Sequence, residues 1–313
     1  MIRRAAVIGR TRLAVEALDV VRRAGDEIVA VIPDRNDSGE DDWQPSLRRA
    51  ASVMGLPILQ PFNVNDAAFV ERLSALRFHF LLSFQASPIL SHPLISTASV
   101  AALNLHYGPL PRYRGLAPVA WALLNGESET AVTLHLMEPG IDSGPIVASL
   151  PVSIGRDETA RSLYESCVDA GIRLFEQTWP SIRGQDAVVG VPQEESAALY
   201  YNRHALDFRI RRIRWDVDAG AIANRMRAFI FPPLQLPELI TGGRCYEVLA
   251  FTWDRQPHPG RPGEVLAVTD DAVIVGAPGG RILLHQLQMG EERFAGSTLA
   301  SALAPGTVFD TPI

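Results

Sequence analysis

Short continuous apolar runs alternate with amphipathic stretches through the first two-thirds of the chain. The runs are typical of strands buried on both faces, and they occupy residues 5–8, 28–32, 78–84, 99–106, 130–137 and 145–154. Apolar side chains at helical spacing lie between or after them, at residues 13–21, 46–54, 66–76, 117–125 and 158–182. This order predicts an α/β domain in which a mostly parallel, Rossmann-like sheet carries helices on both faces.

The pattern changes its period near Asp207. A helix over residues 218–229 precedes short alternating runs with turn residues between them, at residues 244–253, 263–268, 272–275 and 281–289. Short strands at this spacing are typical of a small β-barrel or meander, so we expect a second, C-terminal domain. The polar stretch between the two patterns has little periodicity. We therefore divide the chain into a first domain over residues 1–184, a linker over 185–206 and a second domain over 207–313.

Composition narrows the classes of chemistry. The chain has 313 residues, and all 29 basic residues are arginine, so no lysine is present to form a Schiff base or a Walker A phosphate loop. The formal net charge is −6. From Asp207 onward, 11 arginines are balanced by 12 acidic residues, which leaves no basic lobe for a nucleic acid. The first strand–helix turn, Gly9-Arg10-Thr11-Arg12, lacks the GxGxxG pattern of a dinucleotide site.

The sequence also indicates in which cellular compartment the protein is expected. No apolar run reaches the roughly 20 residues that cross a bilayer, and Arg3 and Arg4 interrupt the N-terminus too early for a secretory signal. Cys167 and Cys245 are too few for a disulfide framework and fit a reducing environment. We expect a cytoplasmic protein with no membrane partner. We expect no metal site, because these histidines have no partner at ligand spacing: His79, His92, His204, His258 and His285.

The densest cluster of chemically capable residues lies within residues 104–115. Asn104 and His106 are two residues apart at the end of a predicted strand, so their side chains point to the same face of the sheet. An amide there can donate a hydrogen bond to a developing oxyanion, and an imidazole can take or give a proton near neutral pH. The pair is a candidate site for acid–base catalysis.

Asp142 is the candidate third member of this site. It lies in a loop after the predicted strand at residues 130–137. A carboxylate beside an imidazole favours the imidazolium and fixes its tautomer. Structural alternatives stay open: His106 can be a buried histidine bonded to backbone, Asn104 can cap a turn, and Asp142 can hold the preceding Pro-Gly turn.

Two arginines and a second histidine accompany the cluster. Arg112 and Arg114 can form a solvated rim or bind an anionic group of a substrate. His135 is a rival base on a strand, and we interpret it as structural and lining the same face. No GxSxG elbow is present, and neither cysteine has a neighbouring histidine that would activate its thiolate, so we expect no enzyme nucleophile.

Three separated blocks carry a family resemblance: Asn104-Leu105-His106, then Leu110-Pro111-Arg112-Tyr113-Arg114-Gly115 with Ala117-Pro118, then Gly140-Ile141-Asp142-Ser143-Gly144. In this order they resemble the 10-formyltetrahydrofolate-dependent formyltransferases, which include methionyl-tRNA formyltransferase and amino-sugar N-formyltransferases. That family carries an OB-like barrel after a polar linker, so the resemblance covers almost the whole chain. The chain is most similar to the formyltransferase domain that acts on UDP-4-amino-4-deoxy-L-arabinose, through stretches at residues 62–65, 70–72, 124–127 and 132–135.

The resemblance implies roles for individual residues. The catalytic trio of the family falls on Asn104, His106 and Asp142. Its folate-binding segments fall on Pro88, Ile89 and Leu90 and on Glu138, Pro139, Gly140 and Ile141. The implied formyl donor is 10-formyltetrahydrofolate, with no metal. One position departs from the pattern: where the relative has an arginine that contacts the cofactor, this chain has Leu116, so Arg112 or Arg114 takes over that contact or the site differs there.

The resemblance further implies a small-molecule amine as the acceptor. A nucleotide-linked amino sugar is the first expectation, with Arg112, Arg114 or arginines of the second domain such as Arg225 and Arg227 meeting its diphosphate. An amino-acid-derived amine such as hydroxyornithine, used in siderophore assembly, comes next. Methionyl-tRNA comes last, because the C-terminal part is near neutral and the loop over residues 34–42 is acidic.

Two alternatives of other classes stay open. The chain can be a non-catalytic module that binds folate or a nucleotide, which Leu116 favours, or a folate hydrolase in which water replaces the amine. The sequence leaves the oligomeric state open, and a homodimer is one of the forms it allows.

Overall fold

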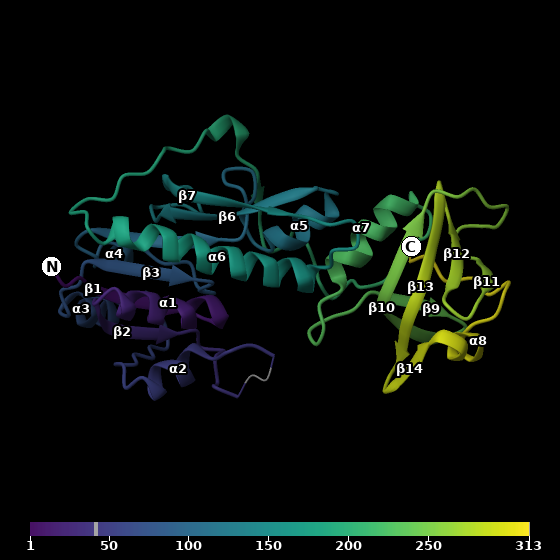
Figure 1. The fold of residues 1–313 in the computed structure, drawn as a ribbon, viewed down its shortest axis with the longest axis horizontal. Helices are drawn as coiled ribbons and strands as arrows, with labels where there is room; N and C mark the ends of the chain where they lie inside the picture. The colour runs from purple at the N-terminus through teal and green to yellow at the C-terminus, as the bar shows by residue number, and fades with distance from the viewer. Residues whose placement is uncertain (41–42, 313) are drawn as a thin grey trace. The chain divides into compact units, whose positions relative to one another are not determined.

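The apolar runs of the first two-thirds of the chain form one sheet. The computed structural model describes residues 1–40 and 43–312. The strands of this sheet are β1 (Arg4–Gly9), β2 (Glu27–Pro33), β3 (Phe80–Phe84), β4 (Ala101–His106), β6 (Glu129–Leu136) and β7 (Ile146–Ser153). They lie in the order β2-β1-β3-β4-β6-β7 (Figure 1). The first four are parallel to one another, and β6 and β7 continue the sheet in antiparallel pairs.

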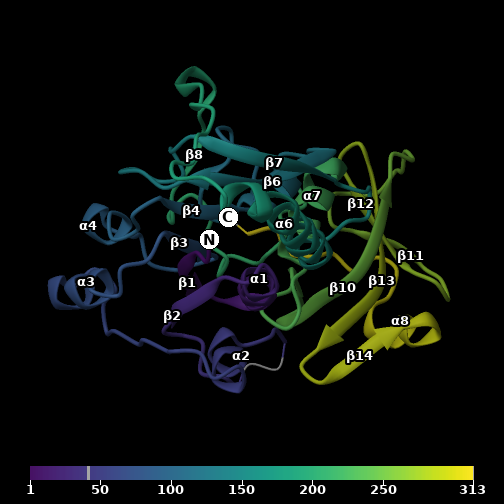
Figure 2. The same ribbon diagram turned by 60° about the vertical axis from the view of Figure 1, so that its left-hand side comes forward.

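Helices cover both faces of this sheet, as the apolar spacing predicts. They are α1 (Thr11–Arg23), α2 (Leu47–Val53), α3 (Ala67–Ser74), α4 (His92–Ile95) and α6 (Ala160–Ile182), and a further helix, α5 (Pro118–Leu124), follows β4 along the chain. On one face α6 packs against β3. The rings of Phe80 and Trp179, and those of Phe84 and Phe175, meet edge to face with 5.1 Å between their centroids. The opposite face has a core that includes Leu73 of α3 and Leu94 of α4. Figure 2 shows α3 and α4 on the other side of the strands from α1 and α6.

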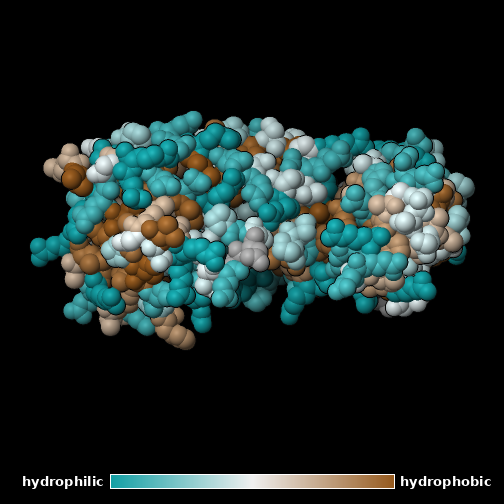
Figure 3. Space-filling model, turned by 60° about the horizontal axis from the view of Figure 1, so that its bottom comes forward, coloured by the Kyte–Doolittle hydropathy of each residue, from teal (hydrophilic) through white to brown (hydrophobic). Residues whose placement is uncertain are grey.

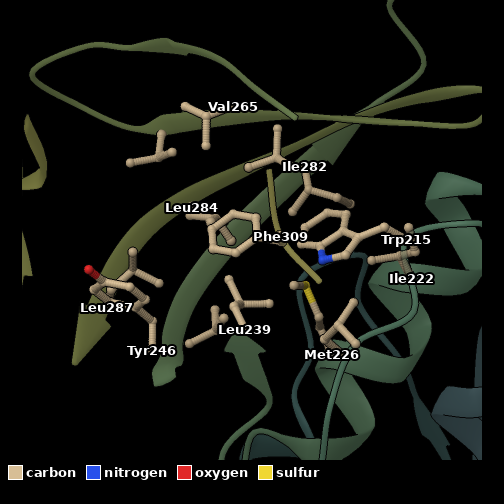
Figure 4. Packing of buried hydrophobic residues seen from close by; sticks show 14 of the residues in the cluster. Trp215, Ile222, Met226, Leu239, Tyr246, Val265, Ile282, Leu284, Leu287 and Phe309 are labelled. Atoms are coloured by element: carbon tan, nitrogen blue, oxygen red, sulfur yellow. The ribbon is translucent and has the colours of Figure 1, made fainter. Parts of the chain in front are cut away.

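A second sheet forms from the C-terminal runs. Its strands are β9 (Glu238–Thr241), β10 (Arg244–Asp254), β11 (Val265–Val268), β12 (Val273–Ala277), β13 (Gly280–Met289) and β14 (Glu292–Ala295), and the neighbouring helices are α7 (Ala219–Phe229) and α8 (Leu299–Ala302). The order is β11-β12-β13-β10-β9, with β14 added to β13, and all pairs are antiparallel. Its core contains Trp215, Phe309 and the inward residues of the strands, with Ile222 and Met226 entering from α7 (Figure 4).

The chain separates into two compact units that do not follow the sequence order strictly. One comprises Met1–Pro118, Glu129–Ser153 and Glu165–Asn202, and the other comprises Val119–Ser128, Ile154–Tyr164 and Arg203–Ile313. The predicted fold class is confirmed: a mostly parallel sheet with helices is followed by an antiparallel half-barrel. The sequence pattern did not reveal β9, β14 or α4, which are four residues each and too short for a periodic signal.

The polar stretch that we predicted as a linker has a defined backbone. Within it lie a 3₁₀ turn, η1 (Glu195–Ala197), and β8 (Tyr200–Tyr201), which pairs in parallel with β5 (Arg114–Gly115). Val191 also pairs with Ile146 of β7, through hydrogen bonds of 2.7 and 2.8 Å in both directions. Residues 191–201, which we call the strap, therefore belong to the first unit.

The surface is that of an ordinary folded chain. The face drawn in Figure 3 carries mainly hydrophilic residues with apolar patches between them. None of the helices in the described part of the chain combines the length and the apolarity needed to cross a membrane.

A buried carboxylate joins the end of α6 to the start of the sheet. The side chain of Asp26 is 0% exposed and accepts two hydrogen bonds of 2.6 Å from Arg183. The same carboxylate accepts hydrogen bonds from the indole of Trp179 at 3.1 Å and from the backbone N–H of Arg3 at 2.9 Å. The hydrogen bonds to Asp26 hold the pKa of the Arg183 guanidinium above its ordinary value. Every oxygen of this buried group is thus paired.

Asp26→Asn is expected to lower the free energy of unfolding by about 2–3 kcal/mol, because it removes the charge and leaves an arginine with a poorer partner. The loss stays below that of a fully buried pair, since Arg183 keeps a quarter of its side chain in water. Urea unfolding measures it. Asp186→Ala is the matched control, because that carboxylate is 94% exposed where it pairs with Arg3. Equal losses in the two variants would contradict this account.

Candidate active site

The register between β4 and β6 brings the first polar side chains together. Asn104 lies opposite His135, and His106 lies opposite Thr133. Residues directly opposite in an antiparallel pair point to the same face of the sheet. Ala102 of β4 belongs to the core under α3 and α4, so Asn104 and His106 extend that same face along the strand.

The loop between β6 and β7 folds back over this face. A Cβ atom on Gly144 would lie 2.0 Å from the carbonyl oxygen of Leu136, so only glycine permits the loop to approach its own strand so closely. Asp142 has a φ of +52°, a left-handed conformation that aspartate tolerates better than most residues. This turn carries the Asp142 carboxylate onto β4.

The Asp142 carboxylate is the centre of the cluster. Its Oδ2 lies 3.5 Å from His106 Nδ1 and accepts a hydrogen bond of 2.9 Å from the backbone N–H of Gly115. Its Oδ1 lies 3.5 Å from His135 Nε2 and 3.4 Å from Asn104 Nδ2. The three residues that the sequence singled out lie together, and His135 joins them.

Backbone carbonyls fix the orientation of both imidazoles. Since a carbonyl only accepts, His106 Nε2 donates to the Tyr113 oxygen at 2.6 Å, and its Nδ1 faces the carboxylate of Asp142. Both ring nitrogens of His106 therefore face acceptors, which the doubly protonated ring satisfies. His135 Nδ1 donates to the Leu136 oxygen at 2.8 Å, and its Nε2 lies 3.1 Å from Asn104 Nδ2 and 3.5 Å from Asp142 Oδ1. The contact from Asn104 Nδ2 to Asp142 Oδ1 is longer, at 3.4 Å. The N–H that makes this contact is therefore the one that can most easily turn toward another acceptor.

Neighbouring charges and hydrogen-bond donors keep the Asp142 carboxyl ionised although it is partly buried. Burial by itself would raise the pKa of the Asp142 carboxyl. The charge of His106, the hydrogen bond and charge of His135 and the Gly115 N–H outweigh burial and hold that pKa far below its ordinary value. A fixed negative charge beside two imidazoles and an amide is an arrangement that can support proton transfer and stabilise an oxyanion.

The two arginines of the loop after β4 have different surroundings. Arg114 is buried, and its guanidinium donates to Gln193 at 3.0 Å and to both oxygens of Glu195 at 3.0 and 2.7 Å. Arg112 is exposed, and its guanidinium carbon lies 5.5 Å from the centroid of the Tyr113 ring. The expectation that either arginine meets a substrate anion therefore suits Arg112 better than Arg114.

The segment at Pro88, Ile89 and Leu90 lies on the same sheet face as Asn104. Leu90 is part of the core under α3 and α4, whereas Ile89 is 68% exposed. Asn65 fixes the backbone here, because its amide donates to the Ile89 oxygen at 2.9 Å and accepts from the Ser91 N–H at 2.8 Å. The segment therefore exposes the apolar side chain of Ile89, while hydrogen bonds with Asn65 fix its backbone.

The remaining positions of the implied donor site lie in the loop of Asp142. Glu138, Pro139 and Gly140 are exposed and Ile141 is half-buried. Leu116 is 53% exposed, and its backbone N–H donates to the Tyr201 oxygen at 2.9 Å. In the described part of the chain, no group of three or more histidine, cysteine, aspartate or glutamate side chains is placed to hold a metal ion.

Sequence reasoning missed two features of the cluster. It interpreted His135 as structural and lining the same face; the β4–β6 register places it on that face, and the missed feature is its contact with Asn104 and Asp142. It also gave no role to Gln193, which contacts the loop of Asp142 from the strap. The register could have been inferred only by pairing the strand that ends at His106 with the strand that contains His135, and nothing in a polar linker signals Gln193.

Comparison with known proteins agrees with this fold. Residues 3–178 match the formyl transferase family, and residues 209–302 match the formyl transferase C-terminal domain. The N-formyltransferase from Helicobacter canadensis, solved with folinic acid and dTDP-3-aminofucose, is similar at 24% identity and a TM-score of 0.74, over 91% of this chain and 99% of that one. The sugar 3N-formyltransferase WlaRD, solved in the presence of dTDP and 5-N-formyl-THF, is similar at 24% identity and a TM-score of 0.73, over 93% and 99%.

A 4-N formyltransferase from Francisella tularensis has the same fold at 18% identity and a TM-score of 0.62, over 75% of this chain and 91% of that one. At these identities the likeness to solved structures establishes the fold alone. The family match extends over more than half of the chain and agrees with the family that the three sequence blocks resemble. The chain therefore belongs to the formyl transferase family of enzymes.

Proposed function

We propose that this enzyme transfers the formyl group of 10-formyltetrahydrofolate to the primary amine of a nucleotide-linked amino sugar. The observation that carries the proposal is the convergence of Asn104, His106 and Asp142 on one sheet face, with contacts of 3.4 and 3.5 Å to one carboxylate. The similar N-formyltransferase from Helicobacter canadensis was solved with folinic acid and a dTDP-linked amino sugar, which supports both the donor and the acceptor class.

The donor supplies a formyl carbon bonded to a nitrogen, and the acceptor amine is the nucleophile. As the amine nitrogen bonds to that carbon, negative charge grows on the formyl oxygen. Asn104 Nδ2 can turn its weakly held N–H from Asp142 toward this oxygen, and a protonated His106 adds a positive charge nearby. Because the substrate brings its own nucleophile, the site needs no serine, cysteine or lysine nucleophile.

Transfer also requires a proton to leave the amine and another to reach the departing folate nitrogen. An imidazole can exchange a proton near neutral pH, and of the two in the cluster we assign this role to His106, through Nδ1, because its Nε2 donates to the Tyr113 carbonyl. Asp142 stabilises the charged ring from its Nδ1 side, and the Tyr113 carbonyl fixes the ring from its Nε2 side. The N–C bond to the acceptor forms, the N–C bond to the donor breaks, and the number of protons is conserved.

The segments assigned to the donor have suitable chemistry. A flat heterocycle needs an apolar contact on one side and backbone hydrogen-bonding groups at its edge. The exposed Ile89 offers the first, and the exposed backbone at Glu138, Pro139 and Gly140 offers the second. These segments and the catalytic trio all belong to the first unit.

The proposed acceptor class rests on the charge of the chain and on the exposed side chain of Arg112. Arg112 is exposed and can meet a diphosphate, whereas Arg114 is buried and its donors contact Gln193 and Glu195. The acidic loop over residues 34–42 is a weaker argument against a tRNA substrate than its composition suggests. Asp34 is buried and accepts from backbone N–H groups at 3.0 and 3.1 Å, and Asp41 and Asp42 lie outside the described residues. The near-neutral C-terminal part remains the argument against tRNA.

His106→Gln and Asp142→Asn are each expected to lower acceptor-dependent release of tetrahydrofolate at least about a hundredfold, because each removes part of the proton-transfer pair. The release is measured from 10-formyltetrahydrofolate with UDP- and dTDP-linked amino sugars, hydroxyornithine and charged initiator tRNA. His285→Gln is the control, since that ring is held by Thr252 and the Asp271 carbonyl in the second unit. Wild-type turnover in either site variant would exclude these roles, and release without any acceptor would indicate a hydrolase.

The ionisation of Asp142 predicts a pH dependence of stability. Its folded pKa is lowered, so its stabilising contribution is complete above the unfolded value near 3.9 and is lost as pH falls toward the folded value. The difference in unfolding free energy between wild type and Asp142→Asn is therefore expected to shrink by about 1 kcal/mol between pH 5 and pH 3. Urea titrations at several pH values measure it. A difference that stays constant or widens over this range would show that the carboxyl is not held ionised.

Arg112→Ala is expected to raise the KM for a nucleotide-linked amino sugar about tenfold, the effect of losing one hydrogen bond to a charged group. The KM for the same amino sugar without its nucleotide should not change, and neither should the melting temperature. Arg114→Ala should instead lower stability and kcat, because it breaks the contacts with the strap. An Arg112→Ala enzyme that binds both acceptors as wild type does would remove this residue from the acceptor site.

A further inference from the structure

We propose that Gln193 of the strap is a positioning residue for formyl transfer, which holds the loop of Asp142 in its reactive place. This inference rests on the proposed function, because it gives Gln193 a role through Asp142. Its basis is a set of contacts from a segment that the sequence identified only as a linker.

The amide of Gln193 bonds to three partners at once. Its Nε2 donates to the carbonyl oxygens of Asp142 and Gly144, both at 2.7 Å. Its Oε1 accepts from Arg114 Nε at 3.0 Å. Carbonyls only accept and a guanidinium only donates, so these partners leave one orientation for the amide.

These contacts hold Asp142 from the side opposite its carboxylate. The carboxylate accepts from the Gly115 N–H at 2.9 Å, while the carbonyl of the same residue accepts from Gln193. Asp142 is in the left-handed region with a φ of +52°, a conformation that costs a non-glycine residue roughly 1 kcal/mol or more and needs surrounding contacts to persist. Gln193 supplies a contact at each end of the segment 142–144.

The strap itself is fixed to the other catalytic loop. The Arg114 N–H donates to the Leu199 oxygen at 3.0 Å, and the Leu116 N–H donates to the Tyr201 oxygen at 2.9 Å. The rings of Tyr113 and Tyr201 stack at 5.5 Å. A Cβ on Gly115 would lie 2.2 Å from the Tyr201 oxygen, so glycine is needed for this approach.

Through the strap, the loop that carries the Tyr113 carbonyl and the Gly115 N–H is tied to the loop that carries Asp142. These groups position His106 and Asp142 respectively. A displacement of about 1 Å between reacting groups can cost on the order of a hundredfold in rate. Loosening this link is therefore expected to lower kcat without removing any group that touches a substrate.

Two nearly isosteric substitutions separate the functions of the amide. Gln193→Glu keeps the acceptor for Arg114 but loses both N–H donors to the loop of Asp142. Gln193→Met removes donors and acceptor together without adding a charge. We expect kcat to fall about 10–100-fold in both variants, while the KM values for donor and acceptor change less than about threefold. Ser196→Ala is the matched control on the strap, because its hydroxyl contacts only Glu194 among the described residues.

A second readout does not depend on turnover. The Gly115 N–H donates to Asp142, so its hydrogen exchange should speed up at least about tenfold in Gln193→Glu and Gln193→Met and stay unchanged in Ser196→Ala. Melting temperatures confirm that each variant is folded. The Leu116 N–H, which donates to the strap backbone, is the internal reference for a general loosening of the loop.

The outcomes distinguish this inference from the proposed function. Loss of kcat at unchanged KM, with faster exchange at Gly115 alone, supports the positioning role. Wild-type kcat in Gln193→Glu but not in Gln193→Met would overturn it, because anchoring Arg114 would then suffice. Wild-type kcat and exchange in both variants would also overturn it. If Asp142→Asn retains full turnover, the proposed function fails, and the exchange of the Gly115 N–H still decides whether Gln193 positions the loop.

Discussion

The negative charge of Asp142 is the interaction on which the arrangement of the site depends. Burial opposes a carboxylate at this position, and two imidazoles, an amide and the Gly115 N–H offset that cost. Three of these partners are in turn fixed by other groups: His106 and His135 by backbone carbonyls, and Gly115 by its approach to the strap. One ionised group is thus the common partner of the polar groups around it.

The sheet explains why such a charge can be held there. The β4–β6 register places Asn104 and His135 side by side before any loop is considered, so two of the partners stand on rigid strands. The loop of Asp142 is the adaptable part, and it is held at both ends, by Gly144 against its own strand and by Gln193 from the strap. Rigid strands and a held loop are together what preorganised catalysis requires.

Much of the fold and part of the candidate site could be predicted from the sequence. Strong apolar runs gave the strands, helical spacing gave α1 and α6, and the two-residue separation of Asn104 and His106 correctly placed both side chains on one face. The sequence analysis placed His135 on the same face, but its position directly opposite Asn104 could not be predicted, because strand register is set by tertiary pairing. The strap could not be predicted either, since its order comes from contacts such as Glu195 with Arg114, made across many residues of sequence, and not from local periodicity.

The measurement that tests the central claim most directly follows an isotope-labelled formyl group from 10-formyltetrahydrofolate. Wild-type enzyme and the Asp142→Asn variant are incubated with a nucleotide-linked amino sugar, and the products are identified by mass spectrometry. The account predicts labelled N-formyl sugar from the wild type and almost none from the variant. Label that appears as free formate, or a variant that formylates the sugar at the wild-type rate, would contradict it.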